Sequence, residues 1–311
     1  MARVSIAWRF ALKAAISAAL LAWLLSHTPL AEIRGVLARL DPLPVAAGMA
    51  LAVATWWLSA VRLWLLAREF PFGQVARMTF VGMYYGTVLP GQVAGDVVKA
   101  YRLSSVQTAP GLAAAATFVD RVVAMIGLLV TCAIAAPWVR QLPSRLAPAI
   151  TTAAAACVLG LALASHRRVR SVFFEASSAA TPGLRGLAAR FGSGLNQVLE
   201  RRGRLASNFA IAMGFHAVCV AIQVILGAAL GIELPVAAWC VTYAGVSLLT
   251  LLPVSIAGLG MREGGYVGLL GLFGIPASQA LSLSLLIFAY AIVGALAGML
   301  VEISDRSNSA R

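Results

Sequence analysis

The sequence predicts an all-α, polytopic membrane protein with about six full spans and two re-entrant, broken helical hairpins, arranged as an inverted-topology repeat. Of its 311 residues, 61% are hydrophobic and only 11% are charged, whereas soluble domains carry about 25% charged residues. Apolar runs of spanning length recur along the chain, and two further apolar stretches are broken by Pro and Gly. Since no segment is polar enough to form a separate soluble domain, residues 1–311 are expected to form a single membrane domain.

The charge balance excludes several classes of function. The net charge is +13, from 24 Lys and Arg against 11 Asp and Glu. The cations cluster between apolar runs, where they set topology and attract anionic lipids, so no nucleic-acid partner is expected. The Cys and His residues show no ligand spacing, and no nucleophile elbow, H-E-x-x-H or Walker-type motif occurs. We therefore expect no metal, no cofactor and no enzymatic activity.

Six apolar runs have the length or the position of full spans. They cover about residues 7–25, 43–66, 111–136, 147–165, 205–230 and 277–303. A cleaved signal peptide is the alternative for the first run, because its uninterrupted core is short, but more membrane follows it instead of a secreted domain. Arg62 lies near the end of the second run, where it is expected to snorkel to the interface.

Two stretches, about residues 74–103 and 236–274, are apolar but broken. The first is interrupted by Pro90 and Gly91, and the second by Pro253. Half-length helical pieces around such a break indicate a re-entrant hairpin, because two full spans would need about 40 residues plus a turn. Two fully spanning helices remain the alternative at each stretch.

One basic segment, about residues 166–204, separates the two halves of the chain. Apolar residues recur in it at helical spacing, at Leu184, Leu187, Phe191, Leu195 and Val198. This stripe predicts an amphipathic helix lying on the membrane surface, and a solvated linker is the alternative. The positive-inside rule places the segment in the cytoplasm.

The two broken stretches share the pattern L-P-x-x-x-A-G, at residues 89–95 and 252–258. At the same offset of 163 residues, Lys99 corresponds to Arg262. The first repeat is expected at about 1–136 and the second at about 147–303. With cytoplasmic N- and C-termini, the two hairpins enter from opposite leaflets and meet near the midplane.

Charged residues at membrane depth are expected to face a cavity and to bind substrate. The candidates are Asp96, Lys99, Arg102, Asp120, Arg121, Arg262 and Glu263. The excess of cations suits an anionic ligand such as a lipid phosphate, with Lys99 and Arg262 as first choices for the contact. The acidic residues are expected to steer a cationic group or a coupled proton. Structural neutralisation within pairs such as Asp96 and Lys99 is the alternative.

Small residues mark the hairpin breaks and several helix contacts. The breaks are assigned to Pro90, Gly91, Gly95, Pro253, Gly258 and Gly260. Small-xxx-small patterns occur at Gly82 and Gly86, Gly91 and Gly95, Gly260 and Gly264, and Gly294 and Gly298. Such patterns are typical of close helix packing, either inside the fold or between the protomers of a homo-oligomer.

Three motifs carry a resemblance to a known family. They are Y-G-T-V-L-P-G-Q-V-A-G-D-V-V-K-A-Y-R-L at 85–103, F-V-D-R-V at 118–122 and P-V-S-I-A-G-L-G-M-R-E-G-G at 253–265. Together they resemble the lysylphosphatidylglycerol synthase transmembrane region, a flippase-like membrane domain that also occurs alone. Because the sequence ends at Arg311, without the aminoacyltransferase domain, the resemblance implies lipid translocation and not lysyl transfer. The family commonly has Arg where this chain has Lys99, and Arg and Lys differ in phosphate geometry.

The leading hypothesis is a lipid translocator of the bacterial inner membrane, with a central polar cavity between the two hairpins. Its partners would be anionic or head-group-modified lipids, and transport would be facilitated or driven by an ion gradient. The alternative is a membrane subunit that presents a lipid to a separate glycosyl- or aminoacyl-transferase without moving it.

Overall fold

A computed structural model describes residues 30–89, 93–106, 110–166, 185–252 and 258–309. Within these ranges every regular element is a helix. The helices are α2 (Leu30–Ala38), α3 (Pro42–Leu66), α4 (Phe72–Val88), α5 (Val93–Val106), α6 (Pro110–Ala135), η1 (Ala136–Trp138), α7 (Leu146–Ala164), α9 (Arg185–Glu200), α10 (Arg202–Ala229), α11 (Val236–Leu251), α12 (Met261–Gly271) and α13 (Ala277–Ser309). The predicted all-α class is confirmed for the described part of the chain.

Within the described residues, five helices are long and apolar enough to cross a membrane: α3, α6, α7, α10 and α13. They coincide with five of the predicted spans. The first predicted span, at 7–25, lies outside the described residues. So do three of the predicted hairpin breaks, Pro90, Gly91 and Pro253.

Local chemistry accounts for several helix ends. At the start of α3, the Asp41 carboxylate accepts a hydrogen bond from the Leu43 backbone N–H at 2.9 Å, and a proline occupies the first turn. Both features suit a helix N-terminus, where backbone N–H groups lack partners and a proline ring fits. Gly231 follows α10 with a φ of 73°, a left-handed conformation that favours glycine at a helix C-terminus.

Helices α3–α6 and α10–α13 form two sets with the same order: long, short, short, long. α4 ends at Val88 and α11 at Leu251, which are 163 residues apart. The helix contacts also correspond, because α4 packs on α13 and α11 on α6, while α5 packs on α6 and α12 on α13. This correspondence matches the element order of the proposed repeat. The re-entrant character of α4–α5 and α11–α12 and their opposite orientation in a bilayer stay predictions.

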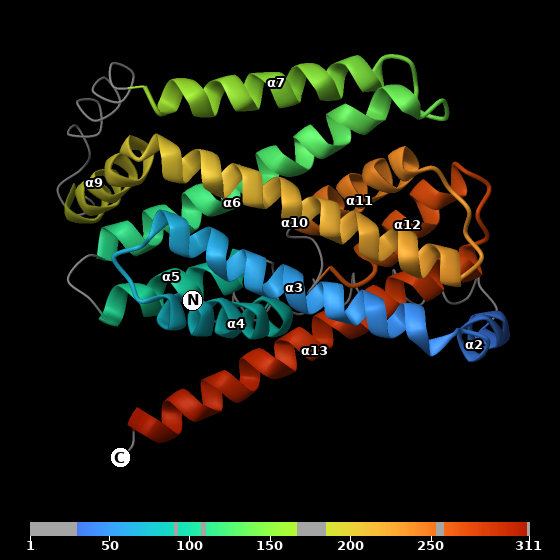
Figure 1. The fold of residues 1–311 in the computed structure, drawn as a ribbon, viewed down its shortest axis with the longest axis horizontal. Helices are drawn as coiled ribbons and strands as arrows, with labels where there is room; N and C mark the ends of the chain where they lie inside the picture. The colour runs from blue at the N-terminus through green and yellow to red at the C-terminus, as the bar shows by residue number, and fades with distance from the viewer. Residues whose placement is uncertain (1–29, 90–92, 107–109, 167–184, 253–257, 310–311) are drawn as a thin grey trace, which may run out of the picture.

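The two sets meet along α3 and α10, which run side by side in opposite directions (Figure 1). Near the end of α3, the Arg62 carbonyl accepts a hydrogen bond from Asn208, near the start of α10. α7 lies at one edge of the bundle against α6, and α13 crosses the opposite side (Figure 1). The two sets and α7 thus pack into one helical bundle.

Part of the apolar stripe of the basic segment packs on α6. α9 confirms a helix over part of that segment, but its Val198 is only 1% exposed and its Phe191 ring lies 5.8 Å from that of Phe118 on α6. Val198 therefore faces protein, and the position of the helix on the membrane surface stays a prediction. Helical periodicity reveals an apolar face, and the neighbouring helix α6 covers it. Leu184 lies outside the described residues.

Glycines allow close approach between helices in both sets. The Gly95 backbone on α5 lies against Gly82 on α4, with no space for a side chain between them. On α13, Gly294 packs against Trp56 and Met83 side chains. Close packing inside the fold is thus confirmed for these patterns. Gly264 differs, because an added Cβ there would meet no atom within 4 Å.

Candidate functional site

A cavity of about 510 Å³, called the central cavity below, lies where the two helix sets meet. Helices α3–α6 and α10–α13 all contribute to its lining. Its charged lining residues are Arg62, Asp96, Lys99, Asp120, Arg121 and Arg262. Charged side chains inside an apolar bundle are costly unless they are paired or face a polar cavity. Here they do both.

Arg62 and Asp120 form a buried, two-pronged ion pair between α3 and α6. Arg62 Nε donates to Asp120 Oδ1 at 2.7 Å, and Arg62 Nη2 donates to Asp120 Oδ2 at 3.0 Å. Asn208 Nδ2 donates to the same carboxylate at 3.0 Å. The planar guanidinium suits this two-pronged geometry.

The expected snorkelling of Arg62 is therefore wrong. Its side chain is only 8% exposed, because Asp120 draws it into the bundle. Arg62 Nη1 is also buried, and it has no hydrogen-bond partner among the described residues. Arg62 also lines the central cavity, so a donor without a partner belongs to a residue of the cavity wall.

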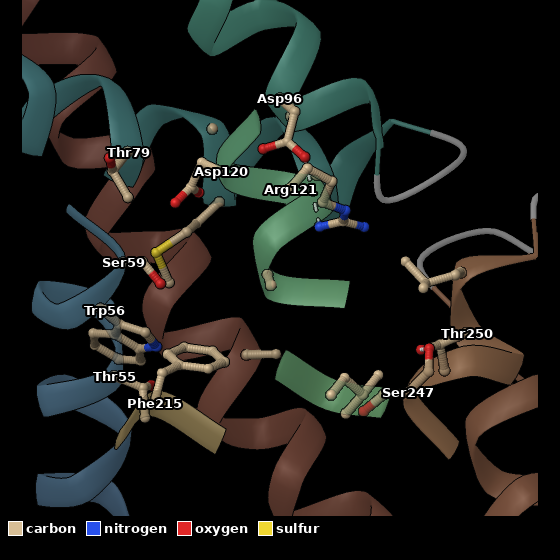
Figure 2. Close-up of a pocket in the computed structure, with 18 of the residues that line it drawn as sticks. Thr55, Trp56, Ser59, Thr79, Asp96, Asp120, Arg121, Phe215, Ser247 and Thr250 are labelled. Atoms are coloured by element: carbon tan, nitrogen blue, oxygen red, sulfur yellow. Dashed lines mark hydrogen bonds and ion pairs between the residues drawn. The ribbon is translucent and has the colours of Figure 1, made fainter. Parts of the chain in front are cut away.

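A second charged group joins α5 to α6. Lys99 Nζ lies 2.9 Å from Asp96 Oδ1, and Arg121 Nη1 lies 3.5 Å from Asp96 Oδ2. Figure 2 shows the Asp96 and Arg121 side chains next to each other among the residues that line the cavity. Arg121 Nη2 is buried without a hydrogen-bond partner among the described residues. One carboxylate is thus shared between two cations, and the guanidinium keeps a spare donor.

The third group lies at the start of α12, just after the second predicted break. Gly258 and Gly260 have φ values of 75° and 81°, in the left-handed region that glycine adopts readily. The Glu263 carboxylate accepts a hydrogen bond from the Gly260 N–H at 2.6 Å and pairs with Arg262 at 2.5 Å. Ser284 on α13 also donates to Glu263. Arg262 lines the central cavity, whereas Glu263 lies behind it, outside the lining.

Arg102 lies apart from the central cavity. Its guanidinium pairs with Glu302 on α13 at 2.6 Å, and Arg306 contacts the same carboxylate at 2.9 Å. The Tyr85 hydroxyl donates to Glu302 at 3.2 Å. The structure therefore brings five of the seven predicted site residues to the central cavity, and Arg102 and Glu263 are not among its lining residues.

Sequence reasoning did not assign three further polar residues of the central cavity to the site. Arg62 is one, and His216 on α10 and Tyr243 on α11 are two more; the His216 ring lies 2.9 Å from the Tyr243 hydroxyl. A signal for Arg62 was present. Asp120 and Arg121 are adjacent on α6, and adjacent helix residues do not face each other, so Asp120 required a cation from another helix.

Fold and cavity together define a multi-pass α-helical membrane protein with an ionic site enclosed by its apolar helices. A family model described as the lysylphosphatidylglycerol synthase TM region matches residues 10–298. The chain belongs to this family, as the three motifs indicated, and this membership is consistent with a lipid-related function in a membrane. Comparisons with curated proteins and with solved structures found no match.

Proposed function

We propose that this protein moves a phospholipid or other amphiphilic lipid across the bacterial inner membrane, with the polar head in the central cavity and the acyl chains in the bilayer. The observation that best supports this function is the charge pattern of the central cavity. Its lining contains four cations and two carboxylates. Two of the cations, Arg62 and Arg121, keep a buried nitrogen without a hydrogen-bond partner among the described residues. Spare guanidinium donors beside an excess of positive charge suit a phosphate.

The free-energy cost of moving a lipid head group through the bilayer supports this assignment. A lipid head group is costly to place in hydrocarbon, because its charge and hydrogen-bonding groups lose water. A polar cavity between the two helix sets supplies replacement partners at that depth. The family membership supports a lipid ligand over a soluble anion. As expected from the sequence, the proposed transport is facilitated or driven by an ion gradient.

Reconstitution into vesicles tests the proposal. Purified protein is placed in liposomes that contain trace head-group-labelled phospholipid, and a membrane-impermeant quencher reports how fast label leaves the inner leaflet. Faster exchange than in empty vesicles is expected for at least one anionic lipid. Exchange equal to that of empty vesicles, for every anionic and aminoacylated lipid tried, would rule out translocation. If a lipid-modifying transferase instead co-purifies with this inactive protein, the presenting subunit becomes the better account.

A further inference from the structure

His216 on α10 lines the central cavity, and its two ring nitrogens contact uncharged groups. The residue is only 4% exposed. Its ring rests against α6, where a Cβ added at Gly127 would come within 3.1 Å of the ring's Cδ2 atom. Nε2 lies 2.9 Å from the Ala124 carbonyl oxygen on α6, and Nδ1 lies 2.9 Å from the Tyr243 hydroxyl on α11. Contacts with two neighbouring helices thus fix the orientation of the ring.

These contacts determine which ring nitrogen can accept a proton. A carbonyl oxygen only accepts hydrogen bonds, so Nε2 must carry the hydrogen that is donated to Ala124. In the neutral ring, Nδ1 then accepts a hydrogen bond from the Tyr243 hydroxyl. When Nδ1 gains a proton, it can donate to the same hydroxyl, because a phenol oxygen both donates and accepts. The site therefore accommodates the neutral and the positive ring with the same two partners.

The charged side chains near His216 are tied into ion pairs. Asp96 and Asp120 are each paired with cations, and Glu263 is paired with Arg262. A change of charge in one partner would leave the other buried and unpaired, which is costly. The titratable groups from the helices around the ring are Arg62 on α3, Asp120 and Arg121 on α6, Cys219 on α10, Tyr243 on α11 and Arg262 on α12. Cysteine and tyrosine ordinarily titrate above neutral pH, so His216 is the group among these described residues that changes charge most readily near neutrality.

An anionic head group in the central cavity would favour the positive ring. The lining contains four cations and two carboxylates, so the cavity wall itself disfavours a further positive charge. A phosphate bound near Arg62 would offset that repulsion, because it adds negative charge to the same cavity. Linkage makes the effect reciprocal: a ligand that favours the protonated ring binds more tightly to the protein whose ring is protonated.

From this geometry we infer that His216 is a proton-binding site coupled to the lipid head group, an inference that rests on the proposed function. Binding of an anionic head group in the central cavity takes a proton from water onto Nδ1 of His216, and release of the head group returns that proton to water. A cavity that opens to each side of the membrane in turn then carries one proton with each anionic head group. The proton gradient is thereby the ion gradient that drives the proposed transport.

Counting protons during lipid binding tests this inference on the purified full chain. Short-chain phosphatidylglycerol is titrated calorimetrically into the protein in detergent, between about pH 5.5 and 7.5, where histidine ordinarily titrates. Two buffers of different ionisation enthalpy are compared, and the difference in heat gives the number of protons taken up per bound lipid. The parent is expected to take up protons, approaching about one per lipid at the optimal pH.

Two histidine variants assign the proton to its site. His216→Gln should bind the lipid without taking up a proton, because an amide can donate to Ala124 and accept from Tyr243 but does not titrate in this range. His166→Gln is the matched control, since His166 is exposed at the end of α7 and outside the cavity lining. It should take up as many protons as the parent. The count is made per bound lipid, so an unfolded fraction that binds none does not alter it.

The outcomes separate the inference from the proposed function. The inference alone is overturned if lipid binds to the parent without proton uptake, or if His216→Gln takes up as many protons as the parent. If His216→Gln does not fold, the ring nitrogen shifts of His216 in the isotope-labelled parent should move to those of the protonated ring when lipid is added, and unmoved shifts overturn the inference. If neither phosphatidylglycerol nor phosphatidic acid binds, the proposed function fails together with the inference.

Discussion

At the scale of single residues, the pair of Arg62 and Asp120 combines a structural and a binding role. Both side chains are almost fully buried, and their two-pronged contact links α3 to α6. Removing one partner of such a pair leaves an uncompensated charge, whereas replacing both by apolar residues is often tolerated. Arg62 Nη1 has no hydrogen-bond partner among the described residues, and Arg62 lines the central cavity, where we propose that it takes part in binding. The structural role and the binding role can be separated by mutation.

The variant Asp120→Leu should destabilise the protein by about 3–5 kcal/mol, because it leaves Arg62 buried and unpaired. Thermal unfolding in detergent measures this effect. The double variant Arg62→Met with Asp120→Leu should recover most of the loss. A double variant as unstable as Asp120→Leu alone would contradict the account of the pair.

Residue-level contacts were the part of the site that sequence could predict least. Asp96, Lys99, Asp120, Arg121 and Arg262 were found from the sequence because charges are rare in apolar runs. The Asp96–Lys99 pair also follows from their spacing. The partner of Asp120 could not be identified, since a contact across 58 residues, as between Arg62 and Asp120, leaves no trace in local spacing.

At the scale of helices, close backbone approach holds α4 and α5 together. A Cβ at Gly95 would run into the Gly82 carbonyl oxygen, which belongs to backbone and cannot rotate away. The Gly95→Ala variant should therefore cost about 1–3 kcal/mol through overpacking. Gly264→Ala is the matched control: open space surrounds that position, and Ala is favoured over Gly in a helix. Equal melting temperatures for the two variants would contradict the proposed contact.

The end of α13 is tied to the first helix set by ions. Glu302 is buried and contacts Arg102, Arg306 and the Tyr85 hydroxyl. Glu302→Gln should loosen this end, and hydrogen exchange over residues 299–309 should rise about tenfold, as expected for losing a charge-assisted hydrogen bond. The exposed Glu233→Gln is the control. Unchanged exchange in Glu302→Gln would show that packing alone holds the helix.

Helix positions were predictable because apolar length and Pro or Gly punctuation follow from bilayer thickness and backbone chemistry. The predicted spans 43–66 and 147–165 each agree with a helix to within a residue or so. What covers a helix face was not predictable. The apolar stripe on α9 would have the same sequence pattern whether lipid or α6 covered it. Periodicity indicates only that this face of the helix is apolar.

At the scale of the whole molecule, the two helix sets predict opposite orientations in the membrane. Gly73 and Val236 are 163 residues apart, at the starts of α4 and α11, and both are exposed. In a cysteine-free background, Gly73→Cys should react with an impermeant reagent from the cytoplasmic side. Val236→Cys should react from the other side. Reaction of both positions from one side would exclude an inverted repeat.

The central claim is that the cations of the central cavity carry a lipid head group across the membrane. Arg121→Gln removes a guanidinium that lines the cavity, while Arg145→Gln removes an exposed one outside it. The decisive measurement is the lipid exchange rate of both variants in the vesicle assay, at equal amounts of folded protein. Arg121→Gln should exchange anionic lipid about tenfold more slowly than the parent, as expected for losing a charge-assisted hydrogen bond, and Arg145→Gln should match the parent. Equal rates for all three proteins would contradict the account.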